Sequence, residues 1–474
     1  MNNFETLNYT QALAYLDNYN RSRMTPGLER IEKLLEHLGN PHLGQKYIHV
    51  AGTNGKGSTC KYIECILDQA GYSVGVFTSP FLVRINENVR LKGIDICDED
   101  FGICMSHIKA ALDGDEVLKS QVSRFEIMTA LGLYYFKGRC DIVVLEVGMG
   151  GLYDSTNVIK DPLLSVITKI SYDHTDFLGN TIEAIALEKA GIIKPNCPVV
   201  VAPQQYKEVL KIFRQAAKDK NSDITPVHNF NESDPRDLLK ELLEHKKFLH
   251  TNEIVLNDDG TFDYSDIASI RTNLNGRHQI DNSATAVQAA LTLSKTLKIS
   301  PQNITDGIAS AFWPCRIEQV STEPTIYIDG AHNMDGLTSL VDFLKDKYGD
   351  KNSNNFLSNS RINNSTNQYI EFEQKFKFVF GVLQGKGYLE MIDMIAPYAD
   401  CAYTVLPDSP KAMNPGTLAE TFISKGIKAT PYLDLSTGIK TMIAESKPSD
   451  IIVVFGSLYM VGYAKEVIKK ELDI

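Results

Sequence analysis

The stretch KYIHVAGTNGKGST, residues 46–59, decides the fold of this chain. Its first half is apolar and predicts a short buried strand, and Ser58 and Thr59 open a predicted helix. Glycines lie between the two, where backbone N–H groups can surround an anion without hindrance from Cβ atoms. Lys56 adds a mobile positive charge, the hydroxyls suit Mg²⁺, and the start of the helix adds a positive dipole. The stretch therefore predicts a strand, a phosphate-binding loop and a helix.

The spacing of this loop, G-x-x-G-K-G-S, differs from the common G-x-x-x-x-G-K-[ST] because Gly57 separates Lys56 from Ser58. The alternative is an ordinary glycine turn between a strand and a helix. The lysine, the hydroxyls and the flanking elements all agree, which favours the phosphate loop. Its candidate nucleotide-binding residues are Gly52, Thr53, Asn54, Gly55, Lys56, Gly57 and Ser58.

The composition is typical of a soluble globular protein with room for two domains. The chain has 474 residues, of which 43% are hydrophobic and 23% charged, and its formal net charge is −11. This charge argues against nucleic acid or an anionic membrane surface as the main partner. The sequence contains no apolar run of transmembrane length and no signal pattern at its polar N-terminus. Eight scattered cysteines without a C-x-x-C pattern indicate reduced thiols, so we expect a cytoplasmic protein.

Apolar strands alternate with helices through the first part of the chain. We expect helices at 9–19, 28–38, 59–69, 124–136, 180–194 and 284–297, and strands at 46–51, 72–78, 141–147, 163–170 and 198–202. Each strand is apolar along its whole length, which is typical of a mostly parallel sheet with helices on both faces. Asn180 is expected to cap the helix at 180–194, with Glu183 in the capping-box position. Residues 81–93 have weak periodicity and predict a functional loop.

A second alternating region follows a boundary near residues 311–316. Its predicted strands lie at 325–328, 377–380, 402–405 and 451–455. We therefore expect an α/β chain with a phosphate-binding domain over residues 1–311 and a smaller, Rossmann-like α/β domain over residues 312–474. Residues 350–368 are rich in Asn and Ser and predict a disordered insertion, whereas residues 204–275 give no clear prediction.

Polar residues follow four predicted strands of the first domain: the phosphate loop, Ser79, Glu146 and His174. Ligands bind outside this edge of a parallel sheet, so the recurrence indicates one site. Glu146 suits Mg²⁺ beside nucleotide phosphates, and the alternative is a strand-end acid that faces water. His174 by itself is as often a packed or exposed histidine as a ligand.

Lys189 lies on the apolar stripe of the helix predicted at 180–194, so it is expected to face the sheet. A buried lysine tends to lose its proton. A neutral amine can react with CO₂ to give a carbamate, which is a carboxylate-like metal ligand. The periodicity alone favours the alternative, a lysine at the rim of the stripe whose ammonium group reaches water.

Three residues of the second region are candidates for nucleotide contacts. Asp329 and His332 follow a predicted strand within DGAHN, where Asp can accept from a ribose hydroxyl and His can meet a base or a phosphate. The alternative is a turn in which both cap local backbone groups. Arg316 near the boundary can reach a γ-phosphate, and its alternative is a linker salt bridge. The residues alone leave these alternatives evenly balanced.

Taken together, these segments resemble the folylpolyglutamate synthase/dihydrofolate synthase family within the Mur ligase superfamily. The phosphate loop alone points only to the superfamily, whereas TSPF, INENVR and RFE point to the folate branch. The resemblance covers most of the chain and rests on GTNGKGS (52–58), TSPF (78–81), INENVRLKG (85–93), RFEIMTA (124–130), EVGMGG (146–151), DSTN (154–157), DHTDFLGNTIEAIALEKAGIIK (173–194), GRHQIDNSATA (276–286), WPCRIE (313–318), DGAHN (329–333) and FGSLY (455–459).

The resemblance implies a role for individual residues. Residues 52–58 would wrap the ATP phosphates, Ser79 and Glu146 would hold one Mg²⁺, and His174 with a carbamylated Lys189 would hold a second. These roles of His174 and Lys189 come from the resemblance and not from spacing. The residues implied to complete the ATP site are Asn282, Arg316, Asp329 and His332. The charge-neutralising catalytic groups would be Lys56, Glu146, His174, Lys189 and Arg316.

The resemblance implies a monomeric, ATP-dependent ligase that joins L-glutamate to a folate, to dihydropteroate, or to both through an acyl phosphate. The alternatives are a cell-wall ligase with a UDP-linked acid and a non-catalytic nucleotide-binding switch. Three features depart from the family pattern, all in the C-terminal region: Met334 after DGAHN, residues 381–387 without the usual acidic residues, and the insertion that starts at Asp350.

Overall fold

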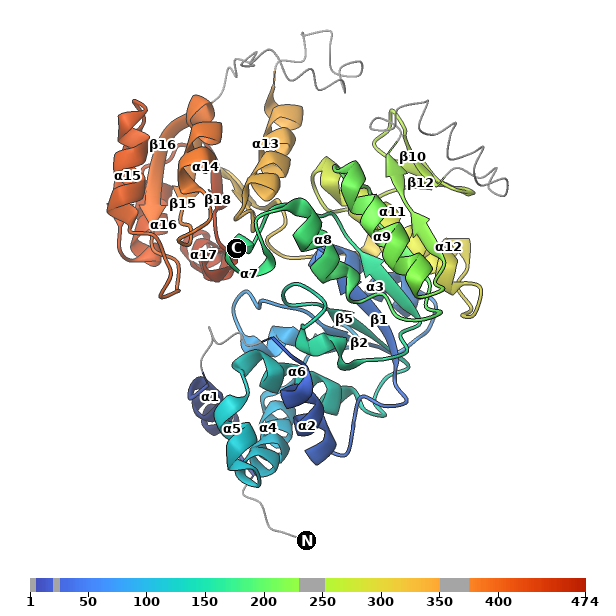
Figure 1. Cartoon of the computed structure of the whole chain (residues 1–474). Coiled ribbons are helices and arrows are strands. Elements are labelled where there is room, and N and C mark those ends of the chain that lie inside the picture. The colour runs from blue at the N-terminus through green and yellow to red at the C-terminus, as the bar shows by residue number, and fades with distance from the viewer. Residues whose placement is uncertain (1–5, 20–25, 230–251, 350–374) are drawn as a thin grey trace. The chain divides into compact units, whose positions relative to one another are not determined.

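A computed structural model of the chain describes residues 6–19, 26–229, 252–349 and 375–474. These residues form two compact units (Figure 1). Within the described residues, the first unit contains 6–19, 26–229, 252–272 and 281–311, and the second contains 273–280, 312–349 and 375–474. Residues 350–368, for which we predicted a disordered insertion, lie outside the described residues.

The first unit is built on an eight-stranded sheet with the order β4-β3-β2-β5-β1-β6-β7-β8. The strands from β2 to β8 in this order are parallel, whereas β3 and β4 add an antiparallel edge. The bounds are β1 Lys46–Ala51, β2 Val74–Phe77, β3 Val89–Leu91, β4 Ile94–Asp95, β5 Ile142–Glu146, β6 Leu164–Ile167, β7 Val199–Val201 and β8 Ile224–Pro226.

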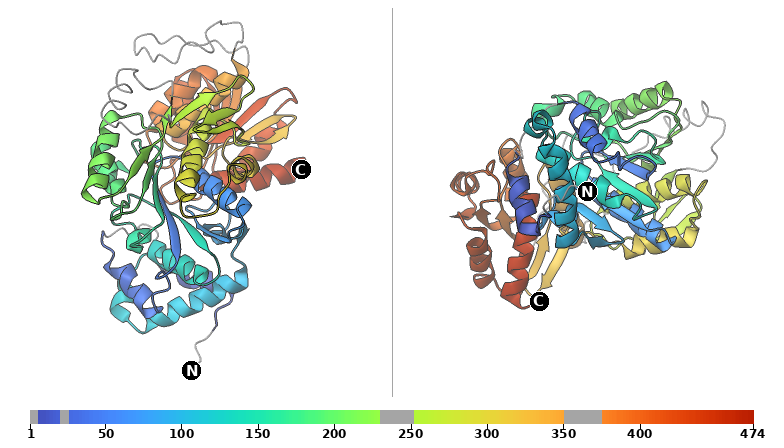
Figure 2. Two further views of the ribbon diagram at one scale, coloured as in Figure 1. Left: turned by 90° about the vertical axis from the view of Figure 1, so that its right-hand side faces the viewer. Right: turned by 90° about the horizontal axis from the view of Figure 1, so that it is seen from below.

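Helices cover both faces of this sheet (Figures 1 and 2). On one face, α3 packs against β1, β2 and β5 and is covered by α12. On the other face lie two apolar clusters, one around α2, α4 and α6 and one around α8 and α9. The helices are α1 Tyr9–Asp17, α2 Glu29–His37, α3 Lys56–Gln69, α4 Asp98–Asp113, α5 Glu116–Gln121, α6 Arg124–Phe136, α7 Thr175–Leu178, α8 Ile182–Ala190, α9 Lys207–Asp219, α11 Arg277–Leu293 and α12 Pro301–Ser310.

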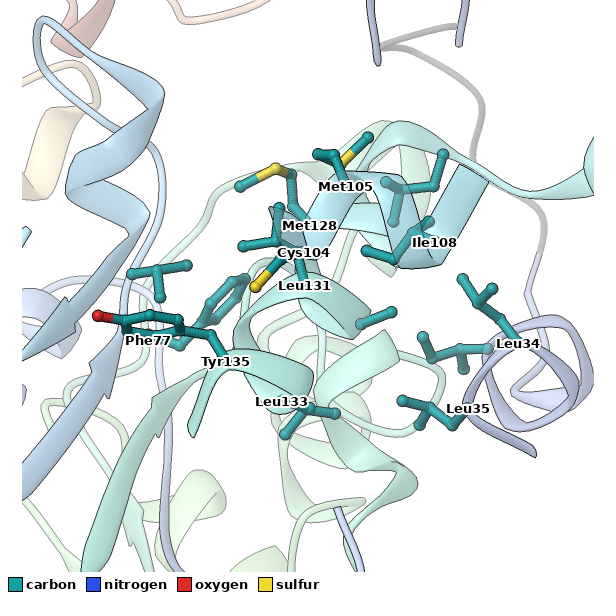
Figure 3. Packing of buried hydrophobic residues seen from close by; sticks show 14 of the residues in the cluster. Leu34, Leu35, Phe77, Cys104, Met105, Ile108, Met128, Leu131, Leu133 and Tyr135 are labelled. Atoms are coloured by element: carbon teal, nitrogen blue, oxygen red, sulfur yellow. The ribbon is translucent and has the colours of Figure 1, made fainter. Parts of the chain in front are cut away.

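The cluster around α6 explains how this part of the unit holds together. Figure 3 shows Leu34 and Leu35 of α2 facing α4 and α6, and Phe77 of β2 packing close to Tyr135. Of the labelled residues only Met128 and Tyr135 exceed 2% exposure. Burying one such side chain contributes about 1.5–3 kcal/mol. Phe125 of α6 packs against the same cluster and touches the segment that follows β5, since a Cβ at Gly148 would lie 2.4 Å from its ring.

A small sheet, order β12-β11-β10-β9, completes the strands of the first unit. Its bounds are β9 His228–Asn229, β10 Glu253–Leu256, β11 Phe262–Tyr264 and β12 Ile267–Ile270. The second unit holds a six-stranded sheet, order β13-β14-β18-β15-β16-β17, in which only β13 is antiparallel to its neighbour. Its strands are β13 Glu318–Thr322, β14 Thr325–Ile328, β15 Phe376–Phe380, β16 Ala399–Val405, β17 Lys428–Tyr432 and β18 Ile451–Phe455. Its helices are α13 Met334–Tyr348, α14 Tyr388–Ile395, α15 Pro415–Ser424, α16 Leu435–Ala444 and α17 Leu458–Leu472.

The predicted α/β class with a mostly parallel sheet is confirmed, and several local predictions need correction. Thr181 and not Asn180 caps α8, because its hydroxyl accepts from the N–H of Ala184 at 3.2 Å. Residues 81–93 are not simply a loop, since they contain a 3₁₀ turn at Ile85–Asn88 and β3. The helix expected at 284–297 begins earlier, at Arg277. In the described part of the chain, no helix is long and apolar enough to cross a membrane.

Candidate active site

The phosphate loop follows β1 in a shape that only glycine allows at two positions. Gly52 has a φ of +150°, and a Cβ there would lie 1.7 Å from the Thr168 hydroxyl. Gly55 has a φ of +87°, and a Cβ there would lie 2.2 Å from Oδ1 of Asn282. L-residues avoid positive φ, and both positions also lack space. The backbone of the loop is therefore free to approach an anion at the N-terminus of α3.

The segment that follows β6 holds the phosphate loop in place. The N–H of Thr53 donates to the carbonyl of Lys169 at 2.9 Å, and the Thr53 hydroxyl donates to the carbonyl of Ser171 at 3.1 Å. The Thr168 hydroxyl donates to the carbonyl of Asn54 at 2.8 Å. Sequence reasoning predicted the strand at 163–170 and singled out His174, but it did not assign Thr168, Lys169 or Ser171 to the site, although their position at the end of an apolar strand was a usable signal. The same segment leads directly to His174.

Two lysines converge on the loop. Nζ of Lys189 donates to the Gly52 carbonyl at 2.9 Å, and Nζ of Lys56 donates to the same oxygen at 3.2 Å. Lys189 is only 3% exposed, which confirms that it faces the sheet. Burial, reinforced by the charge of Lys56, lowers the pKa of Lys189 to about 7. Near neutral pH, a substantial fraction of the protein molecules therefore carry Lys189 as a neutral amine.

Ser79 and Glu146 are neighbours at the carboxyl edge of the sheet. The N–H of Ser79 donates to Oε2 of Glu146 at 3.3 Å, and Glu146 is buried. Val50 pairs with Glu146 across β1 and β5, so the carboxylate lies level with the start of the phosphate loop. A hydroxyl and a carboxylate are hard oxygen donors that fit Mg²⁺.

Protein side chains alone do not enclose a metal here. Among the residues that the structure describes, no group of three or more His, Cys, Asp or Glu side chains is arranged to hold an ion. This fits Mg²⁺, which uses one or two protein ligands together with water and substrate phosphates. The donor set around Glu146 is therefore suitable for a magnesium–nucleotide complex.

His174 stands at the N-terminus of α7 in a left-handed conformation, with a φ of +51°. Its side chain is 44% exposed, and its Nε2 lies 4.0 Å from a carboxylate oxygen of Asp173. The Asp173 carboxylate also acts on Lys189, where it partly opposes the lowering of the pKa. The structure thus relates His174 to Lys189 through Asp173, a residue that the sequence did not single out.

Asn282 is buried within α11 and lies against Gly55. The first unit thus contains the loop residues Gly52, Thr53, Asn54, Gly55, Lys56, Gly57 and Ser58 together with Ser79, Glu146, His174, Lys189 and Asn282.

The remaining candidates form a cluster in the second unit. Asp329 is buried, and its two oxygens accept from the N–H groups of Ile317 and Ala331, each at 2.8 Å. Burial raises the pKa of this carboxyl group, and the nearby Arg316 opposes the rise. The Arg316 guanidinium lies against Gly330, where a Cβ would come within 2.3 Å of Nη1. Nδ1 of His332 lies 2.8 Å from the Gly330 carbonyl, so it carries the proton.

This geometry favours backbone capping as the role of Asp329, because both of its oxygens accept from backbone N–H groups. These bonds hold the segments that carry Arg316 and His332. Their contact with a nucleotide stays a prediction.

Comparison with known proteins finds relatives of one family along nearly the whole chain. The Mur ligase middle domain family matches residues 50–290. The dihydrofolate synthase/folylpolyglutamate synthase of Bacillus subtilis (strain 168) is 34% identical over 472 residues, covering 97% of this chain and 99% of that protein. The folylpolyglutamate synthase of Lacticaseibacillus casei is 33% identical over 466 residues, covering 97% of this chain and 98% of that protein.

Solved structures of related proteins have the same fold as this chain. Escherichia coli FolC in complex with DHPP and ADP has a TM-score of 0.79 and 27% identity, over 98% of both chains. An FPGS–AMPPCP–folate complex has a TM-score of 0.77 and 30% identity, over 98% of this chain and 100% of that one. With relatives above 30% identity matched along almost their full length, the chain belongs to the folylpolyglutamate synthase/dihydrofolate synthase family, which shares the Mur ligase middle domain.

Proposed function

We propose that this protein uses ATP to join L-glutamate to a folate, to dihydropteroate, or to both. The observation that carries the proposal is the meeting of a phosphate loop, two lysines and the neighbouring Ser79 and Glu146 at one edge of the sheet. Full-length relatives named as these synthases support it, as do related structures that hold ADP, AMPPCP and folate.

The reaction runs in two displacements. A carboxylate oxygen of the acceptor attacks the γ-phosphorus of ATP, the bond to the β–γ bridging oxygen breaks, and ADP leaves with that electron pair. The neutral amine of glutamate then attacks the carbonyl carbon of the acyl phosphate. Phosphate leaves with the electron pair of the C–O bond, and the nitrogen loses a proton to give the amide.

The chain contributes positioning and charge to both displacements. The backbone N–H groups of residues 52–58 bind the phosphates, and Lys56 moves from the Gly52 carbonyl toward the charge that develops on them. Ser79 and Glu146 would hold one Mg²⁺, which when bound would supply positive charge to the phosphate oxygens. We further propose that the ATP site is completed by Asn282, Arg316, Asp329 and His332. We also propose that residues 1–311 and 312–474 are the two domains, and that the protein is a cytoplasmic monomer.

Lys189 would supply the ligand for a second Mg²⁺ in this proposal. Its neutral Nζ attacks CO₂, the nitrogen loses one proton, and a carbamate with a carboxylate-like charge results. His174 would hold this ion together with the carbamate. The burial of Lys189 and its pKa of about 7 support this chemistry, because an ordinary lysine is almost entirely protonated at neutral pH.

An isotope experiment tests the reaction class. The acceptor acid is labelled with ¹⁸O in its reacting carboxylate and incubated with ATP, Mg²⁺, bicarbonate and L-glutamate. The acyl-phosphate route places one ¹⁸O atom in the inorganic phosphate for each amide formed. Amide formation with unlabelled phosphate would exclude this route. Nucleotide binding without amine-dependent ADP release would make the protein a switch and not a ligase.

A further inference from the structure

His49 is a buried histidine that the reaction above does not use. It lies within β1, three residues before Gly52, and is 0% exposed. Its side chain points to the same face of the strand as those of Tyr47 and Ala51. Tyr47 belongs to the apolar cluster around α6, and Ala51 belongs to the apolar cluster around α8. A polar ring at the boundary between two apolar clusters needs a specific reason.

The hydrogen bonds around His49 have a defined direction. The Thr156 hydroxyl donates to Oδ1 of Asp154 at 2.6 Å, and the same hydroxyl lies 2.9 Å from Nε2 of His49. A hydroxyl has one proton, so it accepts from His49, and Nε2 carries the hydrogen. Nδ1 is buried and has no hydrogen-bond partner among the described residues. Burial lowers the pKa of His49 to about 3, so the ring stays neutral.

Asp154 also makes a hydrogen bond to the glycine-rich loop at residues 148–152. Besides the Thr156 hydroxyl, it accepts from the N–H of Thr156 at 3.0 Å and from the N–H of Met149 at 2.9 Å. Met149 comes three residues after Glu146. The chain His49–Thr156–Asp154 thus connects the middle of β1 to the segment that leaves the end of β5.

The other end of the glycine-rich loop rests on the helix that carries Lys189. The N–H of Leu152 donates to the carbonyl of Glu188 at 2.8 Å. A Cβ at Gly151 would lie 2.6 Å from that carbonyl and 3.0 Å from Cα of Lys189, so the two backbones are in close contact. The loop therefore runs from the strand that ends at Glu146 to the helix that carries Lys189.

We propose that His49 is a positioning residue whose Nε2–H, through Thr156 and Asp154, fixes the glycine-rich loop that spaces Glu146 from Lys189. The inference rests on the proposed function for the metal-binding roles of these two residues. Without the Nε2–H of His49, the Thr156 hydroxyl is no longer held in place to donate to Asp154. The glycine-rich loop would then relax, and Glu146 and Lys189 would lose their spacing. Loss of a residue that orients metal ligands typically weakens metal affinity about 10–100-fold.

Paired variants separate this role from general destabilisation. Thr156→Val removes the hydroxyl at nearly constant volume, whereas Thr156→Ser retains it. His49→Leu removes the donor, whereas the side-chain amide of His49→Gln can donate from a position near Nε2. Thr404→Val is the control, since Thr404 is a fully buried residue of the second unit whose hydroxyl donates to the carbonyl of Pro415 at 2.7 Å.

The measurement is Mn²⁺ affinity by electron paramagnetic resonance in the presence of AMPPCP, with the melting temperature recorded for each variant. We expect about tenfold or greater weakening for Thr156→Val and His49→Leu, and less than threefold change for Thr156→Ser, His49→Gln and Thr404→Val. Unchanged Mn²⁺ affinity in Thr156→Val would overturn the proposal. If His49→Leu does not fold, Thr156→Val alone provides the test.

A second measurement tests the tautomer directly in the wild-type protein. ¹⁵N NMR should show a protonated Nε2 and a bare Nδ1 for His49 at neutral pH, and a proton on Nδ1 would overturn the inference. Neither measurement depends on turnover. Failure of wild-type ligation with intact Mn²⁺ and nucleotide binding would overturn the proposed function and leave this inference standing.

Discussion

The ammonium groups of Lys56 and Lys189 share one acceptor, the carbonyl oxygen of Gly52, at 3.2 and 2.9 Å. Two positive charges this close disfavour each other, and Lys189 is the more deeply buried of the two. This arrangement is the basis of the proposal that Lys56 meets the phosphates and that Lys189 is the amine that reacts with CO₂.

Removing the positive charge of Lys56 should abolish most turnover without unfolding the protein. A Lys56→Ala variant loses a contact that strengthens in the transition state, and such contacts are worth about 2.7–4 kcal/mol. We expect ADP release to fall by about 10²–10³-fold. The melting temperature should stay close to the wild-type value, because Lys56 is half-buried at the start of α3. Wild-type turnover in this variant would remove Lys56 from the site.

The carboxylate of Glu146 should matter mainly through the metal. Glu146→Ala is expected to abolish most turnover, and Glu146→Gln keeps the volume and tests the charge alone. Both variants should bind Mn²⁺ more weakly in the presence of AMPPCP. Asp141→Asn is a suitable control, because Asp141 is a carboxylate at the opposite end of β5. Wild-type Mn²⁺ affinity in Glu146→Gln would contradict the assignment.

Activation by CO₂ should depend on pH through Lys189. Its pKa is lowered to about 7, so the neutral amine becomes the main form as the pH rises above 7. At a fixed concentration of dissolved CO₂, the rate of activation of the CO₂-depleted enzyme should rise between pH 6 and pH 8 and then level off. Stopped assays after timed exposure to CO₂ measure this rate. An enzyme that is fully active without CO₂ would refute the carbamate.

A small carboxylate should partly replace the carbamate. Lys189→Ala leaves a space beside the Gly52 carbonyl and removes the ligand of the proposed second metal. Acetate or formate should restore part of the ADP release in this variant and have little effect on the wild type. Chloride at equal ionic strength is the control. Equal responses to acetate and chloride would show that no carboxylate is needed at this position.

The contact between Gly55 and Asn282 gives a test of the loop shape. Gly55→Ala places a methyl group where Oδ1 of Asn282 would be 2.2 Å away, at a φ that disfavours alanine by about 1–2 kcal/mol. We expect at least tenfold weaker AMPPCP binding by calorimetry. In an Asn282→Gly background, Gly55→Ala should weaken AMPPCP binding less than it does in the wild type, because the clash is absent there and only the φ strain remains. An equal loss in both backgrounds would show that the strain alone accounts for it.

The sequence predicted five strands of the eight-stranded sheet, β1, β2, β5, β6 and β7, because each is a continuous apolar run with polar residues at its end. The short strands β3, β4 and β8 lack such a run and were not predicted. The apolar stripe of α8 placed Lys189 toward the sheet, but periodicity alone favoured a lysine at the rim that reaches water, and the buried position in the structure differs from that alternative. The cap of that helix was misplaced by one residue, because Asn180 and Thr181 are both good caps and only the backbone decides between them.

Other features could not be predicted because they depend on contacts far apart in the chain. Thr168 fills the space beside Gly52, and Asn282 fills the space beside Gly55, although 116 and 227 positions separate the partners. The helix α9 was missed although Val209, Phe213 and Ala217 recur at four-residue spacing and are buried. Its polar neighbours concealed a pattern that was present in the sequence.

The central claim is tested most directly by ADP release from MgATP in the presence of bicarbonate and L-glutamate, measured separately with dihydropteroate and with tetrahydrofolate. We predict glutamate-dependent release with at least one of the two acceptors. Release with dihydropteroate identifies folate synthesis, release with tetrahydrofolate identifies polyglutamylation, and release with both identifies a bifunctional enzyme. Bound ATP without release in either reaction would contradict the account.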